Sequence, residues 1–288
     1  MFKLGFITDE VSQDVSRVVQ FARDFEAPAL EMRSIQETPV EKISVAQARE
    51  LQKIFSDNGL YIHSVASPVF KCRFDSEEEI RQHLDHLKHV LELAHIWGSH
   101  IIRVFTFWRE SVSGPLEAVV EKFLPAARVA EDAGIPLGVE NEDSTFVGSG
   151  KELAQFLALA NHDKVQAIWD PQNAFYRTRG AESAVAGYEA VKSWVLHVHV
   201  KDADLDTKTG EPVAAELGKG KVDWPAQLKA LQSDHYSGVL SLETHWRDVP
   251  LDEKLLNQPG GSQFSDRAEQ ASRICMSHLV DMIRELGD

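Results

Sequence analysis

The sequence contains few cysteines and no hydrophobic run long enough to cross a membrane. Only Cys72 and Cys275 occur among 288 residues, and they do not form a metal-type pair. This scarcity favours a reduced cytoplasmic protein over one built on disulfides. The apolar stretch at the N-terminus is interrupted by Asp9 and Glu10, too early for the core of a signal peptide. We therefore expect a cytoplasmic protein with no membrane association.

Positive charge is also in short supply. The chain has 30 Lys and Arg against 45 Asp and Glu, a formal net charge of −15. A groove for the phosphates of a nucleic acid would have to be built against this field, so we expect no nucleic-acid partner. The hydrophobic fraction of 43% and the charged fraction of 26% are typical of a soluble globular protein.

The chain lacks low-complexity tracts and linkers rich in Gly, Ser or Pro, so we expect residues 1–288 to form a single domain. Short apolar or β-branched runs alternate with longer segments of helical periodicity. This alternation predicts an α/β protein with a parallel sheet, and eight units fit a closed (β/α)8 TIM barrel. An open doubly wound sheet is the alternative, disfavoured because no glycine-rich phosphate turn follows the first strand. The expected strands are 3–8, 28–33, 60–66, 100–107, 136–142, 165–171, 194–201 and 238–246.

Helical periodicity fills the segments between these strands. Pro125 lies inside one expected helix and predicts a kink or a break there. The expected helices are 14–26, 44–59, 76–98, 115–134, 149–160, 224–234 and 265–286, with the weakest pattern at 181–193.

Two long segments, at about 203–223 and 247–264, follow the seventh and eighth strands on the expected catalytic side. Both contain glycines, which fits lids or specificity loops. The alternatives are structural connections or a subunit contact. The glycines that we single out are Gly218, Gly220, Gly260 and Gly261.

Most of the expected strands carry a polar or ionisable residue near the C-terminal end. This residue lies on the face of the strand opposite to the residues that pack on the helices. The stretch LHVHVKD (196–202) places His197 and His199 on one face of a strand and apolar residues on the other. Active sites of this fold lie at the C-terminal mouth. Unpaired ions buried there cost several kcal/mol each, so these groups need one another, a metal or a charged substrate.

Four of these residues come from the fifth to eighth strands, one from each: Glu140, Asp170, His199 and Glu243. Neighbouring strands lie about 5 Å apart, so the four side chains can converge on one point. Three carboxylates and an imidazole suit Mn²⁺, Mg²⁺, Co²⁺ or Zn²⁺. The alternative is that each acid is an ion-pair partner or a helix cap. His197, one layer deeper, is expected to support a ligand or to pack in the core.

The remaining inward-facing residues have less specific interpretations. His63 and Arg103 are candidates for substrate contacts or for partners of the acids. Glu31 and Arg33 are expected to pair with each other. Trp108 follows the fourth strand and either walls the pocket or packs in the core.

Seven segments, spread along essentially the whole chain, form a recognisable ordered set. They are GFITDEVSQD, ASPVFKCRF, GVENED, IWDPQNA, LHVHVKD, LGKGKVDW and GVLSLETHW. Together they resemble the xylose-isomerase-like TIM-barrel superfamily, and in particular its sugar phosphate isomerase/epimerase proteins. That group contains ketose 3-epimerases and inosose-processing enzymes.

The resemblance implies one divalent metal ion held by Glu140, Asp170, His199 and Glu243, with Glu140 and Glu243 also moving protons. Two positions depart from the ketose 3-epimerases. Those enzymes carry a histidine three residues after the aspartate, where this chain has Asn173, and an arginine six residues after the ligand histidine, where it has Leu205. Both departures count against a free ketose as the substrate.

The implied activity is that of a metal-dependent isomerase or epimerase acting on a sugar, keto-sugar or related polyol. Carboxylates would transfer a proton α to a carbonyl. A metal-dependent dehydratase (lyase) of a keto-inositol or keto-sugar shares this first step and is the alternative. A non-catalytic sugar binder is a further one, whereas the net charge and the single four-ligand set speak against an endonuclease.

A small-molecule carbohydrate is the expected partner, and association into a homo-oligomer is compatible with the fold. Asn173 and Lys201 follow ligand positions and are candidates for hydrogen bonds to sugar hydroxyls. The alternative for Lys201 is a solvent-exposed loop residue.

Overall fold

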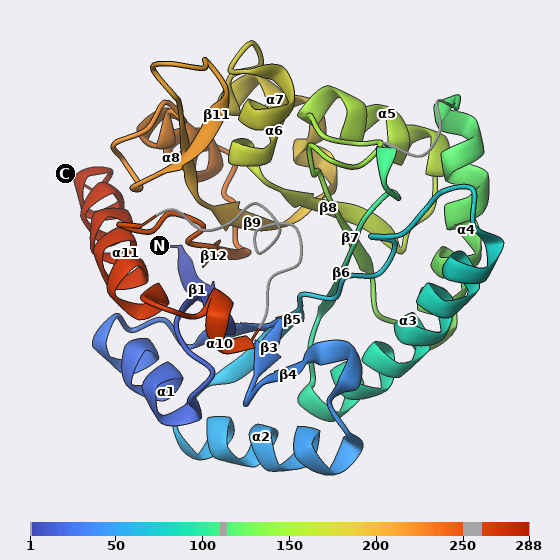
Figure 1. The fold of residues 1–288 in the computed structure, drawn as a ribbon, viewed down its shortest axis with the longest axis horizontal. Coiled ribbons are helices and arrows are strands. Elements are labelled where there is room, and N and C mark those ends of the chain that lie inside the picture. The colour runs from blue at the N-terminus through green and yellow to red at the C-terminus, as the bar shows by residue number, and fades with distance from the viewer. Residues whose placement is uncertain (1, 110–113, 250–260, 288) are drawn as a thin grey trace.

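The chain folds into a closed barrel of eight strands surrounded by helices (Figure 1). The computed structural model describes residues 2–109, 114–249 and 261–287. Every pair of neighbouring barrel strands is parallel, and the strand order around the barrel is β1-β12-β9-β8-β7-β6-β5-β2. The predicted (β/α)8 barrel is therefore confirmed, and the open doubly wound sheet is wrong.

All eight predicted strands are present, each within the predicted range. They are β1 (Lys3–Ile7), β2 (Ala29–Met32), β5 (Tyr61–Val65), β6 (Ile101–Val104), β7 (Leu137–Glu140), β8 (Val165–Trp169), β9 (Val195–Val200) and β12 (Val239–Leu242). Between them lie short 3-10 turns η1 (Thr8–Glu10), η2 (Val40–Lys42) and η4 (Lys192–Trp194).

The helices form an outer ring that buries the apolar outer face of the strands. Phe6 of β1, for example, packs edge-on against Phe21, with ring centroids 4.7 Å apart. The helices are α1 (Val15–Asp24), α2 (Val45–Asp57), α3 (Glu77–Trp97), α4 (Leu116–Ala133), α5 (Gly150–Ala160), α6 (Pro171–Thr178), α7 (Ala184–Val191), α8 (Trp224–Ser233), α10 (Gly261–Phe264) and α11 (Ala268–Glu285). No helix of the described ranges combines the length and apolar composition needed to cross a bilayer.

Two local predictions about the helices need correction. α4 continues through Pro125, so the predicted break is wrong. α6 was not predicted, although its start carries a recognisable signal. Asp170 caps it by accepting a hydrogen bond from the backbone N–H of Asn173, and Pro171 fills the first turn, where no N–H is needed.

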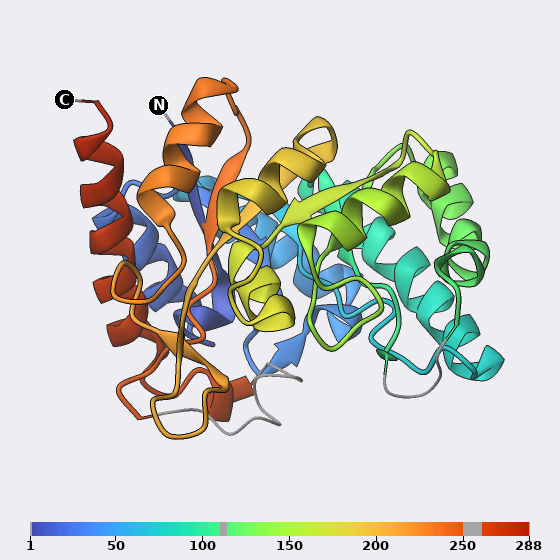
Figure 2. The same ribbon diagram turned by 90° about the horizontal axis from the view of Figure 1, so that it is seen from above.

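The connections after the strands project from one side of the barrel (Figures 1 and 2). They include two antiparallel hairpins, β3 (Ser34–Ile35) with β4 (Thr38–Pro39) and β10 (Asp202–Leu205) with β11 (Pro212–Ala215). The predicted loop 203–223 thus begins as a hairpin. After the hairpin, the chain turns around the Asp202 carboxylate, which accepts hydrogen bonds from the backbone N–H groups of Gly218 and Gly220. Residues 250–260 of the second predicted loop lie outside the described residues.

The inner face of the barrel carries small or apolar side chains at some levels and ionisable side chains toward the C-terminal mouth. Gly138 of β7 leaves space for a neighbouring side chain, because a Cβ there would lie 2.6 Å from Cγ1 of Ile168. The charged residues at the mouth are almost completely buried. The fold therefore brings its ionisable groups together in a site shielded from water.

Candidate metal and catalytic site

Four side chains from consecutive barrel strands converge at the mouth. Glu140 is the last residue of β7, Asp170 directly follows β8, His199 lies near the end of β9, and Glu243 directly follows β12. One donor atom from each lies within 4.8 Å of those of the other three, and all four residues are buried. The convergence expected from strand parity is therefore present.

The imidazole of His199 is the centre of this group. Its Nδ1 lies 3.1 Å from Glu140 Oε1, 3.1 Å from Glu243 Oε2 and 3.7 Å from Asp170 Oδ2. One ring nitrogen thus faces all three carboxylates. Its other nitrogen, Nε2, points to the opposite side, toward Glu31.

Lys201 lies inside the same cluster and is only 3% exposed. Its Nζ is 2.9 Å from Asp170 Oδ2 and 2.8 Å from Glu243 Oε2. The alternative of a solvent-exposed loop residue is wrong, because position 201 continues the inward parity of His199. Burial acts to lower the pKa of Lys201, but Asp170 and Glu243 outweigh it and raise the pKa well above its usual value.

Arg103 of β6 closes the other side of the cluster. Its Nη1 lies 3.3 Å from Glu140 Oε2 and 3.7 Å from Glu243 Oε1. Burial acts to raise the pKa of Glu140, but His199 and Arg103 more than offset it and the pKa is lowered to about 2. The pKa of Glu243 is likewise lowered against the effect of burial, with Lys201 the strongest of the opposing groups. Both glutamates are therefore ionised at neutral pH.

Arg33 does not pair with Glu31, so that prediction is wrong. Its guanidinium contacts three other acids instead, at 2.9 Å from Asp9, 2.8 Å from Glu10 and 2.7 Å from Glu243. Glu31 faces the histidines of β9, which leaves Arg33 to the acids nearer the mouth. Sequence reasoning did not assign Asp9 and Glu10 to the site, although their position directly after the first strand was a usable signal.

Sequence reasoning also did not assign His245 and Arg247, which lie beside Glu243 and Glu10. His245 Nε2 lies 3.3 Å from Glu243 Oε1, and Arg247 Nη2 lies 3.0 Å from Glu10 Oε2. Glu10, Glu243 and His245 are close enough to form a metal-type group. The guanidinium of Arg33 already contacts both acids of that group, so the charge of these acids is compensated without a metal.

Asn173 reaches the cluster, but its amide is directed at a protein carboxylate. Its Nδ2 donates to Glu140 Oε1 over 3.0 Å and to the carbonyl oxygen of Asn141 over 2.9 Å. This contact follows from α6, which starts at Asp170 and places Asn173 one turn later. The side chain therefore orients Glu140.

The remaining predicted residues, His63 and Trp108, have aromatic and cationic neighbours. His63 packs between the rings of His197 and His100, with centroids 5.4 and 5.7 Å away. The ring of Trp108 lies 5.6 Å from Nζ of Lys71, and this ammonium is 3.2 Å from Glu142.

The loop after β7 carries an unusual acid. Burial raises the pKa of Asp143 to about 7, and the neighbouring Glu142 reinforces the effect. Lys71 and Lys201 pull in the opposite direction but do not cancel it. Asp143 is thus an acid that can hold or release a proton near neutral pH.

The charge balance of the barrel mouth leaves room for a divalent cation that replaces the proton on Nδ1 of His199. The buried carboxylates outnumber the buried lysine and arginine side chains by two. The carboxylates are Asp9, Glu10, Glu31, Glu140, Asp170 and Glu243; the cations are Arg33, Arg103, Lys201 and Arg247. Burial acts to lower the pKa of His199, but Glu31, Glu140 and Glu243 raise it well above its usual value, so the ring adds one positive charge while no metal is bound.

The donor atoms themselves also fit a metal. Glu140 Oε2 and Asp170 Oδ2 are buried and accept no hydrogen bond from the part of the chain that the structure describes, although Arg103 and Lys201 lie near them. Mixed oxygen and nitrogen donors are those that Mn²⁺, Mg²⁺, Co²⁺ and Zn²⁺ accept. Glu140, Asp170, His199 and Glu243 therefore fit a divalent metal ion.

Comparison with known families agrees with this architecture. The family model described as the xylose isomerase-like TIM barrel matches residues 19–262. The chain therefore belongs to the xylose isomerase-like TIM-barrel family. A search of curated protein sequences returned no match.

Solved structures similar to this chain cover nearly all of it. A xylose isomerase domain protein from Planctomyces limnophilus has a TM-score of 0.73 and 16% identity, over 99% of this chain and 98% of that one. A probable 3-DHS dehydratase, AsbF, from Bacillus anthracis has a TM-score of 0.70 and 14% identity, over 96% and 98%. D-psicose 3-epimerase from Clostridium cellulolyticum H10 has a TM-score of 0.67 and 17% identity, over 95% and 99%. Identities this low show a shared fold and no more.

Proposed function

We propose that this protein is a divalent-metal-dependent isomerase or epimerase acting on a sugar, keto-sugar or related polyol. The observation that carries the proposal is the convergence of Glu140, Asp170, His199 and Glu243 at the barrel mouth. Two of these carboxylates, Glu140 and Glu243, belong to strands separated by two others. A substrate between them would meet a carboxylate on each side.

The metal ion would be held by the same four residues. It would supply Lewis-acid stabilisation of the negative charge that develops on a substrate oxygen when the α proton leaves. Enzymes similar in fold that act on such substrates include the D-psicose 3-epimerase named above.

Glu140 and Glu243 are the proposed proton carriers. One takes the proton α to the carbonyl, and the other returns a proton to the opposite face. Isomerisation needs one carboxylate that delivers the proton to the neighbouring carbon. Arg103 and Lys201 keep the two glutamates ionised, so either can accept the α proton. The glutamate on the opposite face takes up a proton from solvent before it returns one to the substrate.

For the substrate contacts, we retain Arg103, Lys201 and Trp108 as proposed residues. Asn173 is better assigned to orienting Glu140, because its amide donates to that carboxylate. His63 packs against the rings of His197 and His100, so we propose it as a packing support for His197 and not as a substrate contact.

A dehydratase is the second candidate, and Asp143 is the observation that favours it. Loss of water requires that the departing hydroxyl receive a proton while the α proton goes to a carboxylate. Asp143, with a pKa raised to about 7, suits that donor role. The probable dehydratase from Bacillus anthracis has a similar fold.

The decisive experiment combines metal analysis with hydrogen exchange. We expect the purified protein to contain about one equivalent of a divalent metal. A panel of keto-sugars and inososes in D₂O, followed by NMR, should show C–H exchange with a reversible epimer or isomer pair. Loss of water would favour the dehydratase, and absence of exchange with every substrate would favour a sugar-binding protein.

The roles of the glutamates are tested in the same assay. Glu140→Gln and Glu243→Gln should each abolish exchange, because each removes a proton carrier. The metal content of each variant separates loss of the proton carrier from loss of the metal. Full activity of a metal-loaded variant would remove that glutamate from the proton-transfer role.

A further inference from the structure

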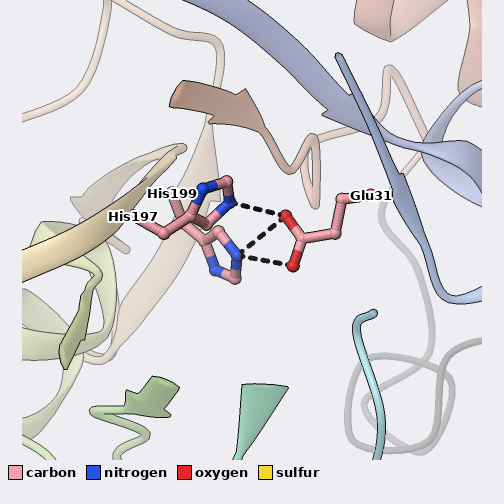
Figure 3. A group of neighbouring side chains, drawn as sticks. All are labelled: Glu31, His197 and His199. Atoms are coloured by element: carbon pink, nitrogen blue, oxygen red, sulfur yellow. Dashed lines mark hydrogen bonds and ion pairs between the residues drawn. The ribbon is translucent and has the colours of Figure 1, made fainter. Parts of the chain in front are cut away.

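Glu31 crosses the barrel interior to meet both histidines of β9. It lies on β2, and two strands, β1 and β12, separate β2 from β9. His197 Nε2 lies 2.8 Å from its Oε2, and His199 Nε2 lies 3.2 Å from each carboxylate oxygen. Figure 3 shows the two imidazoles converging on this one carboxylate. Ser241 of β12 also donates a hydrogen bond from its hydroxyl to Glu31 Oε2, over 2.8 Å.

This arrangement fixes a proton on one nitrogen of each ring. An ionised carboxylate only accepts hydrogen bonds, so its partners on both rings must be N–H groups. Each ring therefore carries a proton on Nε2. For His199, Nδ1 faces the ionised carboxylates of Glu140 and Glu243, so this nitrogen also carries a proton until a metal ion takes its place.

Glu31 fixes the proton on the other nitrogen of the His199 ring. A ring without a proton on Nε2 would turn a lone pair toward the carboxylate of Glu31, which is unfavourable. Glu31 thus keeps the nitrogen nearest to the three proposed ligand carboxylates available for coordination. A partner that holds the far nitrogen of a metal-binding histidine in this way sets the ring orientation and raises the basicity of the ligand.

We propose that Glu31 is a positioning residue that holds His199 with Nδ1 toward Glu140, Asp170 and Glu243, and so sets how tightly this site binds a divalent cation. This inference rests on the proposed function, since it assumes that the four residues hold a metal. It also gives the paired histidines of β9 distinct tasks. His199 faces the carboxylates, while His197 and Ser241 hold Glu31 in place.

The burial of Glu31 supports a specific role of this kind. The residue is 1% exposed and contacts none of the three carboxylates. An ionised carboxylate buried this deeply costs several kcal/mol unless it is well hydrogen-bonded. Its hydrogen-bond partners are two imidazoles and a hydroxyl, so its effect on the site passes through the imidazoles.

Two substitutions separate positioning from charge. Glu31→Gln keeps the size of the side chain but offers one acceptor oxygen and an N–H₂ donor group. Glu31→Asp keeps the charge but withdraws the carboxylate by one methylene. If the hydrogen bond to His199 is what matters, both variants should bind Mn²⁺ about 10- to 100-fold more weakly than the wild type, measured by competition titration on the whole chain.

A spectroscopic readout that needs no metal accompanies the titration. In two-bond ¹H–¹⁵N correlation spectra of the metal-free protein, His197 and His199 should each carry a proton on Nε2 in the wild type. In Glu31→Gln the amide oxygen takes the place of Oε2, which accepts from His197 and Ser241, so the N–H₂ group faces Nε2 of His199 and that nitrogen should lose its proton. His197, which should keep its proton on Nε2, is the internal reference.

Glu182→Gln is the control for the loss of a buried carboxylate. Glu182 caps α5 by accepting N–H bonds from Gly150 and Lys151, and it has no contact with the proposed ligands. We expect Glu182→Gln to keep the wild-type affinity for Mn²⁺. Circular dichroism of each variant shows that it is folded before titration.

The outcomes are distinct. Wild-type protein that binds no Mn²⁺ overturns the proposed metal site itself. Wild-type affinity in both Glu31 variants overturns the role of Glu31 and leaves the metal site standing. Weak binding in Glu31→Gln together with wild-type binding in Glu31→Asp shows that charge alone matters, which also overturns positioning. If Glu31→Gln does not fold, Glu31→Asp decides between positioning and no role.

Discussion

Lys201 Nζ lies 2.8 Å from Glu243 Oε2, in the middle of the proposed metal ligands. The ammonium group is also 2.9 Å from Asp170 Oδ2. A lysine ammonium and a divalent cation stabilise the same carboxylates, so each partly substitutes for the other. Without a metal, Lys201 is the main source of positive charge for Asp170.

Removal of this lysine should make the folded protein dependent on metal. In Lys201→Met, Asp170 and Glu243 lose a buried cationic partner, which typically costs about 3–5 kcal/mol. We expect this loss in the presence of EDTA, measured by urea unfolding. Added Mn²⁺ should then stabilise the variant more than it stabilises the wild type.

Lys53→Met is the matched control, because Lys53 pairs with Asp57 on the exposed face of α2. Its stability should stay close to that of the wild type, with or without metal. Equal stabilisation by Mn²⁺ in Lys201→Met and the wild type would show that Lys201 and the metal do not share their carboxylates.

Asn173 should affect turnover more than substrate affinity. Its amide donates to Glu140 Oε1 over 3.0 Å, so Asn173→Ala frees a proposed proton carrier to rotate. A hydrogen bond to a charged group contributes about 1.5–3 kcal/mol, which corresponds to roughly a 10- to 100-fold loss in kcat. Steady-state kinetics on the substrate found in the exchange assay would measure it. A rise in KM with unchanged kcat would instead make Asn173 a substrate contact.

The fold and the convergence of the four proposed ligands were predictable from the sequence. β-Branched and apolar runs alternating with helical segments define eight strands. The C-terminal ends of parallel strands meet at one mouth, so residues near these ends come together whatever their separation in the chain. Glu140 and Glu243 are 103 positions apart in numbering, yet both lie within the same cluster.

Contacts across the barrel were not predictable in the same way. Parity shows that Glu31 and Arg33 face inward, but the partner of each depends on strand tilt and on side-chain reach across the interior. Glu31 therefore meets His197, which is 166 residues away, and not Arg33. The helix α6 is different, because the Asp170–Pro171 pair contained a capping signal that strand periodicity obscured.

Arg33 should be essential for stability. It contacts Asp9, Glu10 and Glu243, and its side chain is only 5% exposed. Arg33→Gln leaves these acids with one fewer cation, so we expect a loss of about 3–5 kcal/mol in the free energy of unfolding. Urea denaturation at pH 7 is the measurement.

Arg17→Gln provides the comparison for Arg33. Arg17 pairs with Glu269, but its side chain is 61% exposed. An exposed ion pair contributes about 0–1 kcal/mol, so this variant should remain close to the wild type. Equal losses in the two variants would mean that burial of Arg33 does not determine its contribution.

His63 should make the folded protein sensitive to acid. Burial and the nearby His197 lower the pKa of His63 to about 3, with His100 and Lys3 acting in the same direction and Glu31 opposing them. In the unfolded chain its pKa is near 6.5. Between these values the unfolded state binds the proton and the folded state does not. The contribution of His63 to stability is therefore present above pH 6.5 and is lost as the pH falls toward 3.

His63→Gln should remove this part of the pH dependence. From pH 7.5 to pH 5, the wild type should lose about 2 kcal/mol more of its free energy of unfolding than the variant, measured by urea denaturation. His235→Asn, which changes an exposed histidine, should follow the wild-type curve. The comparison depends on the slope with pH, so a constant packing defect in His63→Gln does not affect it. Parallel curves for His63→Gln and the wild type would show that His63 titrates alike in the folded and unfolded states.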